Sequence, residues 1–500
     1  MAKRKRDEAA KETQATQPSK PTKSSKKEPL SFEHSDGAAI TLQIVTGSYE
    51  RVLHGFTASI PTTCLAAEKT KESAGDSSSV QFVDTFMFEA HASAIKCLAM
   101  SPLPKTDSTE PPKVILASGG SDERVNLYTL SAAPPTVNEH YPTVPTLAGN
   151  KILENPKNRE LGALLHHSAP ITALVFPSRS KLLASAEDNT ISVSKTRDLN
   201  VVSTIKAPHP KVQGRPSGDT APPGGSPSGV NDFAVHPSMK LMLSVGKGER
   251  CMRLWNLVTG KKAGVLNFNK DILQSVKEGR WSTGEGRKIA WNTKGEEFAV
   301  AFEWGAVLFG IDSTPICRVV PGPRSKLHGI RYISIGPEDE DELFAVSTED
   351  GRVIFYSTKK LRNPEEGDDS TIMHAEPVAQ FGGRSQGFPG RVKEFEILSL
   401  NGQPGVKDDD FSVVTANSEG VVRVWQLFGV KLREALSKKS SDSKDIQVAR
   451  LLGSYETGNR ITCLKAFVMM PSEEPTPEDD FGSFDEESDE ESSSEGSDDD

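Results

Sequence analysis

Histidine, cysteine and carboxylate side chains could carry catalysis or metal binding, and the 500-residue sequence has ten, five and 69 of them. His166 and His167 form the only adjacent histidine pair, and no cysteine or carboxylate stands beside them at metal-ligand spacing. No GxxxxGK[ST] loop, no GxGxxG at a strand-to-helix turn and no HExxH motif is present. We therefore expect no catalytic residue, no metal and no cofactor.

The carboxylates instead follow a repeated spacing. Residues 249–255, ERCMRLW, begin with Glu249 and place Trp255 six residues later, with apolar residues alternating between them. Ser194 takes the aromatic position in one further copy, and most copies follow an apolar run that ends in small residues, such as VILASGGS. The other six copies are Glu50 with Phe56, Asp122 with Tyr128, Asp188 with Ser194, Glu303 with Phe309, Asp350 with Tyr356 and Glu419 with Trp425.

This repeat predicts small antiparallel sheets. Two alternating strands joined by a turn of small residues and an acid form a hairpin, in which the acid accepts hydrogen bonds from backbone N–H groups of the turn. Side chains six residues apart on a strand share a face, so the aromatic side chain can fill the gap to the next sheet. One small sheet cannot bury both of its faces, whereas a closed ring of sheets can. A β-sandwich whose strands match by chance is the alternative.

Seven ordered copies predict an all-β, seven-bladed propeller over residues 37–470. Successive acids are 47–72 residues apart, more than the ~40–45 residues of a minimal blade, so we expect inserted loops. The longest insertions are 66–80, 131–160, 207–228, 359–390 and 431–458. The last apolar run, 459–470, has no hairpin after it. We therefore expect 460–468 to pair with the first blade and close the ring.

The net charge of −10 averages two opposite ends. Residues 1–27 carry +6 and residues 473–500 hold 15 acids without a basic residue, which leaves −1 for the middle. We expect 1–36 and 471–500 to be disordered tails. The basic tail is typical of nuclear import or RNA phosphate contact, through Lys3, Arg4, Lys5, Arg6, Lys26 and Lys27. The acidic tail offers candidate phosphorylation sites with an acid three residues on, namely Ser483, Ser488 and Ser497.

One inserted loop combines basic residues with an aromatic ring. Residues 384–393, RSQGFPGRVK, lie just before a predicted blade and contain Arg384, Phe388, Arg391 and Lys393. Loops on a rigid scaffold commonly carry function, so we predict a contact site there. Scattered surface charge is the alternative.

The repeat pattern resembles that of WD-repeat β-propellers, with WN and WQ in place of the WD dipeptide. More narrowly, TGSYERVLHGF, HHSAPITALVF, LLASAEDNTISV and the run over 230–263 resemble the PAK-interacting-protein-like WD-repeat family of large-ribosomal-subunit assembly factors. The resemblance implies a seven-bladed WD40 propeller and a nucleolar, nuclear protein. Glu249 and Ser194 depart from the usual motif, and we expect looser polar bonding in their two blades.

The resemblance and the tails together favour a non-catalytic scaffold in 60S subunit biogenesis and rRNA processing. The resemblance implies that the partners are assembly factors and ribosomal proteins of the large subunit, together with pre-rRNA. We expect no membrane contact and a monomer within the pre-60S particle. Five widely spaced cysteines indicate a reduced intracellular protein. Two alternatives stay open: a negative regulator that binds a p21-activated protein kinase, and a substrate receptor of a ubiquitin ligase. The absence of WDxR after Trp255 and Trp425 argues against the latter.

Overall fold

The computed structural model describes residues 39–66, 80–104, 112–134, 144–145, 151–209, 228–279, 282–336, 341–364, 370–403, 406, 409–437 and 446–471. These residues all belong to one compact unit, Ala38–Asp500. The tail residues Lys3, Arg4, Lys5, Arg6, Lys26, Lys27, Ser483, Ser488 and Ser497 lie outside the described residues.

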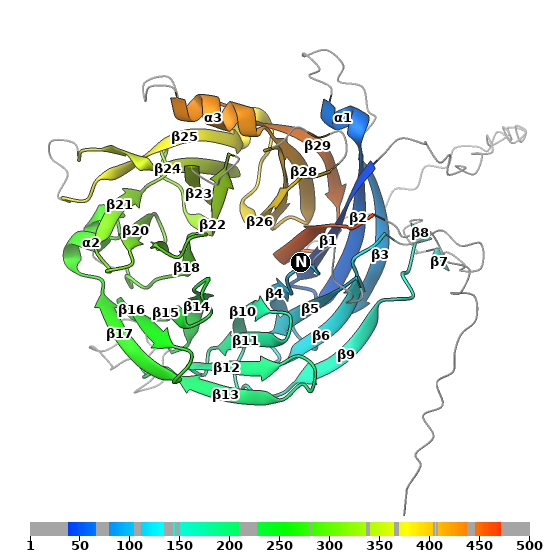
Figure 1. Cartoon of the computed structure of the whole chain (residues 1–500), viewed down its shortest axis with the longest axis horizontal. Helices are drawn as coiled ribbons and strands as arrows, with labels where there is room; N and C mark the ends of the chain where they lie inside the picture. Colours follow the sequence, from blue (N-terminus) through cyan, green and yellow to red (C-terminus); the bar gives the residue numbers. More distant parts are fainter. Residues whose placement is uncertain are drawn as a thin grey trace, which may run out of the picture. The chain divides into compact units, whose positions relative to one another are not determined.

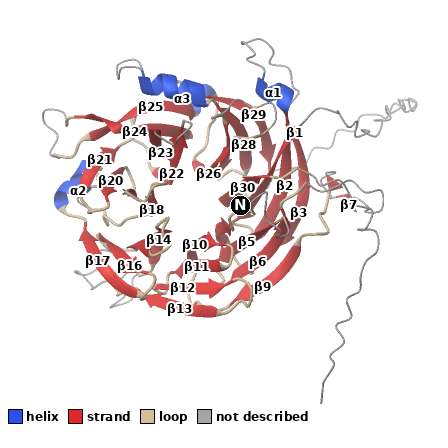
Figure 2. Cartoon of the chain, viewed as in Figure 1, coloured by secondary structure: helices blue, strands red, loops and turns tan. Residues whose placement is uncertain are grey.

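The described chain forms seven four-stranded antiparallel blades that follow one another around a ring (Figure 1). The prediction of an all-β, seven-bladed propeller is therefore confirmed, and Figure 2 shows how little helix accompanies the strands. From the centre outward, blade 1 consists of β30 (Ile461–Val468), β1 (Ala39–Ser48), β2 (Val52–Pro61) and β3 (Gln81–Glu89). Blade 2 consists of β4 (Ile95–Met100), β5 (Lys113–Gly120), β6 (Val125–Ser131) and β9 (Arg159–Leu164). Blade 3 consists of β10 (Ile171–Ser178), β11 (Lys181–Ala186), β12 (Thr190–Lys195) and β13 (Val201–Lys206).

The remaining four blades have the same order of strands. Blade 4 consists of β14 (Val230–Val235), β15 (Leu241–Gly246), β16 (Cys251–Asn256) and β17 (Lys261–Asn267). Blade 5 consists of β18 (Lys288–Trp291), β19 (Glu297–Ala301), β20 (Ala306–Gly310) and β21 (Pro315–Val319). Blade 6 consists of β22 (Leu327–Ile335), β23 (Asp341–Thr348), β24 (Arg352–Arg362) and β25 (His374–Gly382). Blade 7 consists of β26 (Val392–Ser399), β27 (Phe411–Asn417), β28 (Val421–Leu427) and β29 (Ala449–Glu456).

A strand-to-strand bridge, two short strands and a few short helices are added to the seven blades. A parallel bridge from Arg318 to His374 joins the outer strands of blades 5 and 6 into one eight-stranded sheet. The two-residue strands β7 (Val144–Pro145) and β8 (Lys151–Ile152) extend blade 1 beyond β3. The helices are α1 (Thr62–Ala66), α2 (Lys270–Ser275), α3 (Gly429–Ser437) and the 3-10 turn η1 (Arg384–Gln386).

The core lies between blades, because each middle strand packs a neighbouring blade on either face. Every residue of β27 is buried, whereas most residues of the outer strand β17 are exposed. The repeated aromatic residue belongs to a cluster that reaches the preceding blade. Trp255 on blade 4 shares a buried cluster with Ile191 on blade 3, and Tyr356 on blade 6 shares one with Leu308 on blade 5. Because both faces of a middle strand are buried, its residues are mostly apolar and do not alternate strictly between apolar and polar.

The two ends of the ring share blade 1. β30 pairs antiparallel with β1 from Val468 opposite Leu42 to Ile461 opposite Ser48. The Arg460 N–H donates to the Glu50 carboxylate at 2.9 Å, and the Thr462 hydroxyl donates to the Ile95 carbonyl at 2.6 Å. A strand from the C-terminal end therefore completes the blade that the N-terminal end begins.

Outer strands occupy parts of three segments that we had assigned to inserted loops. β9 begins within 131–160, β25 lies in 359–390, and α3 with β29 occupies much of 431–458. Gly162 and Pro377 interrupt any apolar alternation in the first two of these strands. They form because the third strand of each blade offers an unpaired edge, and this tertiary pairing overrides weak strand propensity.

Candidate functional site

The groups that most resemble a catalytic constellation lie inside blade 2. His91 contacts the Asp122 carboxylate through Nδ1 at 2.9 Å and the Ser118 hydroxyl through Nε2 at 2.8 Å. The His91 side chain is 0% exposed and Ser118 is fully buried. A catalytic nucleophile must be accessible to its substrate, and the enclosed Ser118 is not. The three side chains instead connect the segment before β4 to the turn after β5. Asp122 also accepts hydrogen bonds from the Ala92 N–H before β4 at 2.9 Å and from the Arg124 N–H of its own turn at 3.5 Å.

Blade 3 repeats this bonding with the histidine pair. His167 contacts Asp188 through Nδ1 at 3.2 Å and Ser192 through Nε2 at 2.8 Å. Burial lowers the pKa of His167, which favours the neutral form of its ring. His166 instead bonds Thr204 on β13 at 2.8 Å. The pair does not converge on one point, and no three His, Cys, Asp or Glu side chains cluster at metal-binding distance in the part of the chain that the structure describes.

Blade 4 is not loosened by its glutamate, contrary to our expectation. Glu249 forms a two-point ion pair with Arg253 four residues on, with 2.5 Å between Oε1 and Nη2. Trp255 donates from Nε1 to the Ser244 hydroxyl at 2.8 Å. The glutamate in the turn reaches a partner on the strand that follows it, β16, so this blade has an ion pair where blades 2 and 3 have a buried histidine. In blade 3, Ser194 is buried and Phe176 belongs to the cluster between blades 2 and 3.

Blades 6 and 7 distribute the turn bonding differently. Asp350 accepts a hydrogen bond from Arg352 Nε at 2.8 Å, and Tyr356 is buried, which raises the pKa of its phenol. In blade 7 the Asn417 amide oxygen accepts from the Glu419 N–H at 3.1 Å and the Val421 N–H at 2.8 Å. Asn417 therefore holds the turn that we had assigned to Glu419, because an Asx side chain at the end of a strand can cap the following turn.

Trp425 links blade 7 to blade 6 and to the predicted contact loop. Its Nε1 donates to the Thr415 hydroxyl at 3.0 Å. Its ring packs edge-on against Phe388 with centroids 4.8 Å apart, and Phe388 is partly buried. Phe388 is thus used for packing between blades, not presented as an isolated surface aromatic.

The basic residues of the same loop have separate environments. Arg391 donates from Nε to the Ser418 hydroxyl at 2.6 Å, and burial lowers the pKa of Lys393. Arg384 is exposed, and its side chain makes no hydrogen bond or ion pair with another residue that the structure describes. Of the four predicted contacts, Arg384 is the one most available to a ligand.

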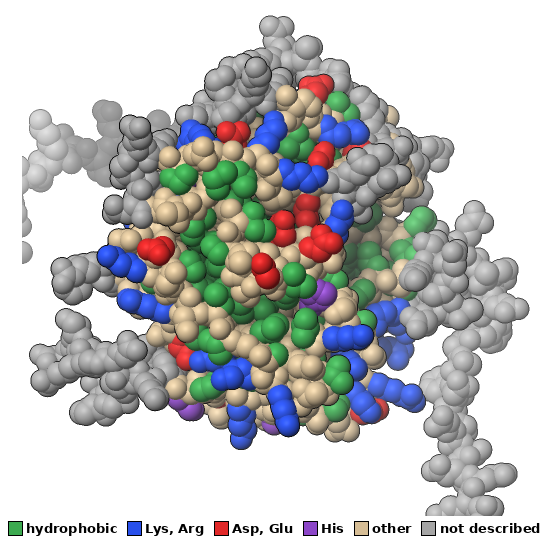
Figure 3. All heavy atoms as spheres, turned by 60° about the vertical axis from the view of Figure 1, so that its left-hand side comes forward, with side chains coloured by type: hydrophobic (Ala, Val, Ile, Leu, Met, Phe, Trp, Pro, Cys, Tyr) green, Lys and Arg blue, Asp and Glu red, His purple; other side chains and the backbone are tan. Residues whose placement is uncertain are grey.

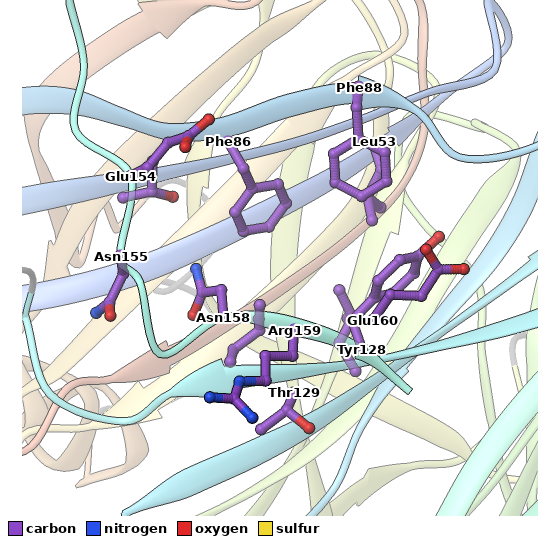
Figure 4. A pocket seen from close by; sticks show the side chains of 13 residues that line it. Leu53, Phe86, Phe88, Tyr128, Thr129, Glu154, Asn155, Asn158, Arg159 and Glu160 are labelled. Carbon is purple, nitrogen blue, oxygen red and sulfur yellow. The ribbon is translucent and has the colours of Figure 1, made fainter. Parts of the chain in front are cut away.

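A cavity of about 350 Å³ opens on the outer rim between blades 1 and 2. Phe86, Phe88 and Tyr128 point into it, while Asn155 and Glu160 border its open side (Figure 4). Phe88 is 41% exposed. No feature of the sequence predicted this cavity. The run FMFE at the end of β3 places two aromatic residues on the face of the strand that meets blade 2, where Phe88 packs edge-on against Tyr128 with ring centroids 5.5 Å apart.

Charged residues also line the centre of the ring. A cavity of about 300 Å³ there is bordered by inner strands and includes Asp232, Lys288 and Glu394. Arg331 on β22 contacts Glu394 and Glu396 on β26, each at 3.0 Å. Lys465 on β30 contacts Glu396 as well. These charges pair with one another across neighbouring blades.

The outer surface mixes charge types. On the side of the ring that carries α2, basic side chains gather along the lower edge of the view and acidic ones nearer its middle, with hydrophobic side chains between them (Figure 3). Among the described residues no helix is both long enough and apolar enough to cross a membrane.

Comparison with known proteins supports the propeller assignment. Residues 158–193, which contain most of blade 3, match the WD40 family, described as WD domain, G-beta repeat. The protein MAK11 of Saccharomyces cerevisiae is 25% identical over 84% of this chain and 82% of its own length. A p21-activated protein kinase-interacting protein 1-like protein of Danio rerio is 24% identical over 86% of this chain and 82% of its own. The Shk1 kinase-binding protein 15 of Schizosaccharomyces pombe is 23% identical over 87% and 86%. The chain is therefore a β-propeller with a WD40 match in residues 158–193, and it is similar along most of its length to MAK11 and to p21-activated protein kinase-interacting protein 1-like proteins.

Proposed function

We propose that this protein is a non-catalytic scaffold in assembly of the large (60S) ribosomal subunit. It binds pre-ribosomal particles in the nucleolus and nucleus through propeller loops and tails, and it contacts assembly factors, ribosomal proteins of the large subunit and pre-rRNA. The observation that carries the proposal is the similarity to MAK11 and its relatives over more than four-fifths of each chain, together with the resemblance to the assembly-factor family.

The blade chemistry supports a binding role over an enzymatic one. The Ser118, His91 and Asp122 constellation is enclosed in blade 2, and the corresponding groups of blade 3 hold a second turn. Both sets are used to make the ring rigid. A rigid ring with variable loops suits the task of holding several partners in fixed positions.

Depletion of the protein followed by sucrose-gradient profiling of ribosomal subunits tests the proposal. We expect a selective deficit of large subunits, with accumulation of large-subunit rRNA precursors and normal small subunits. Re-expression of the full chain should restore the profile, and re-expression of a chain without 1–36 tests the import role of the basic tail. Unchanged large-subunit levels after depletion would contradict the proposal.

A second function is favoured by the names of the relatives, which are said to interact with or bind p21-activated and Shk1 kinases. In this alternative the propeller binds a p21-activated protein kinase and restrains it. Normal subunit profiles with raised kinase activity after depletion would support this function over assembly.

A further inference from the structure

A basic pocket of about 440 Å³ opens where blades 5, 6 and 7 meet. Its residues come from the segments before β18 and β22, the start of β22, the turns between β19 and β20 and between β23 and β24, and the segment between β25 and β26. Inner strands begin at this end of the ring, and the turns from second to third strands return to it, so residues far apart in sequence converge. Its lining includes one indole and five cations, namely Trp304, Arg287, Arg324, Lys326, Arg384 and Arg391.

An indole with a cation over its ring lines this pocket. The Arg324 guanidinium carbon lies 4.1 Å from the centre of the Trp304 ring, and the Lys326 ammonium lies 5.3 Å from it. Arg324 also donates to the Lys277 carbonyl at 3.1 Å, which restrains its position. Arg324 is nevertheless exposed and Trp304 is partly exposed. A guanidinium held in this way can stack on a nucleobase as well as bind a phosphate.

Positive charge exceeds negative charge in this pocket. Glu303 is paired with Arg287 at 3.1 Å and with Lys326 at 2.7 Å, and the Lys326 hydrogen bond together with Arg287 and Arg324 lowers its pKa. Asp350 is neutralised by Arg352, with 2.7 Å between their nearest atoms.

The remaining carboxylate does not restore the balance. Glu349 is shared between His328 at 2.5 Å and Arg391 at 3.6 Å. Arg384 has no partner among the described residues. Apart from Asp350, which pairs with Arg352, the pocket holds two carboxylates, Glu303 and Glu349. They face five cations, which are Arg287, Arg324, Lys326, Arg384 and Arg391.

We propose that this pocket binds a nucleotide of single-stranded RNA, with its phosphate on Arg384 and Lys326 and its base against Arg324 and Trp304. The inference rests on the proposed function, because pre-rRNA is the RNA that an assembly scaffold meets. A phosphorylated peptide would also be drawn to the cations. The indole and the volume favour RNA, because a phosphoryl group alone needs neither a stacking surface nor a cavity in the size range of whole ligands.

The test is fluorescence anisotropy of the full chain with a labelled single-stranded RNA of about 12 nucleotides, which lies within the ~4–16 nucleotides that one single-strand-binding module covers. We expect Arg324→Ala combined with Arg384→Ala to weaken binding about tenfold, because the stacking of one base on Arg324 and the phosphate contact of Arg384 are lost. The slope of log Kd against log salt should fall by about 0.7, since each phosphate contact on a single strand contributes ~0.7. Both arginines are exposed, so the thermal melting temperature should not change.

The matched control removes two positive charges elsewhere. Lys181 and Lys195 lie opposite each other on the adjacent strands β11 and β12 of blade 3, and both are exposed. Their double alanine variant should bind RNA as the wild type does. Equal weakening by this control would overturn the inference, because net charge alone would then explain the effect. Glu303→Gln supplies an opposite test, since it removes the competing carboxylate and should tighten binding about threefold.

The remaining outcomes separate this inference from the proposed function. Unchanged RNA affinity in the arginine double variant overturns the pocket assignment. The assignment also fails if a phosphoserine peptide displaces the labelled RNA and unlabelled RNA does not. In depleted cells the double variant should restore large subunits less well than the lysine control. If depletion leaves subunits normal while the pocket still governs RNA binding, the assembly role fails and the pocket inference stands.

Discussion

Replacing Glu396 by glutamine tests whether the charges at the centre of the ring hold the closing strand. Glu396 lies on β26, between β22 and β30, and accepts hydrogen bonds from Arg331 at 3.0 Å and from Lys465. Its side chain is 15% exposed. One carboxylate therefore joins the closing strand to two neighbouring blades.

The size of the effect follows from the proton affinity of Glu396. Burial alone would raise its pKa, but Arg331 and Lys465 outweigh burial and lower the pKa from 4.5 to about 2. A tenfold change in proton affinity corresponds to ~1.4 kcal/mol, so the ionised carboxylate stabilises the fold by roughly 3 kcal/mol at neutral pH. Glutamine keeps one acceptor oxygen, so we expect Glu396→Gln to lower the free energy of unfolding by about 2–3 kcal/mol.

The pH dependence has a definite direction. A carboxyl whose pKa is lower in the folded state contributes its full stabilisation above its ordinary pKa and loses it as pH falls toward the folded-state value. The gap between wild type and Glu396→Gln should therefore be constant from pH 7 down to about 5.5 and should narrow between about 4.5 and 2. Urea unfolding followed by tryptophan fluorescence measures this gap without adding salt that screens charges.

Glu89→Gln is the matched control, because it removes the same charge from an exposed ion pair. Glu89 and Arg51 are 3.4 Å apart with side chains 63% and 46% exposed, so the loss should stay below about 1 kcal/mol. Equal stability of Glu396→Gln and wild type at pH 7 would refute the reasoning. A gap that persists undiminished in acid would refute it as well.

Three further substitutions and one deletion test the blades. Trp425→Ala should lower the free energy of unfolding by about 3–5 kcal/mol, because it opens a cavity between blades 6 and 7, whereas Trp425→Phe should cost only about 1–2 kcal/mol through the lost bond to Thr415; urea unfolding measures both. Asp122→Ala should lower the free energy of unfolding by about 1–3 kcal/mol, because it leaves Nδ1 of the buried His91 without its carboxylate partner. Faster amide hydrogen exchange at the start of β4 would locate the loss of stability there. Deleting 459–470 should abolish cooperative thermal melting, and an unchanged melting profile would count against closure through β30.

The site could be predicted only in part. The spacing of Asp122 and Asp188 indicated turn bonding, and the structure shows both in that role with a histidine and a serine. Glu249 and Asn417 could not be assigned in the same way, because which side chain bonds a turn depends on reach and on neighbouring strands. Phe388 shows the same limit, since its packing on Trp425 depends on how blades 6 and 7 approach each other.

The sequence by itself determined the repeat, the all-β class and the number of blades. Strand periodicity, turn residues and the aromatic six residues after an acid are local features. They recur around the ring, with Ser194 in place of the aromatic in blade 3, because each blade faces the same packing problem. Tertiary structure alone decided the outer strands, the rim cavity and the basic pocket around Trp304. These depend on edges and turns from different blades that meet only when the ring closes, and no local pattern in the chain records that meeting.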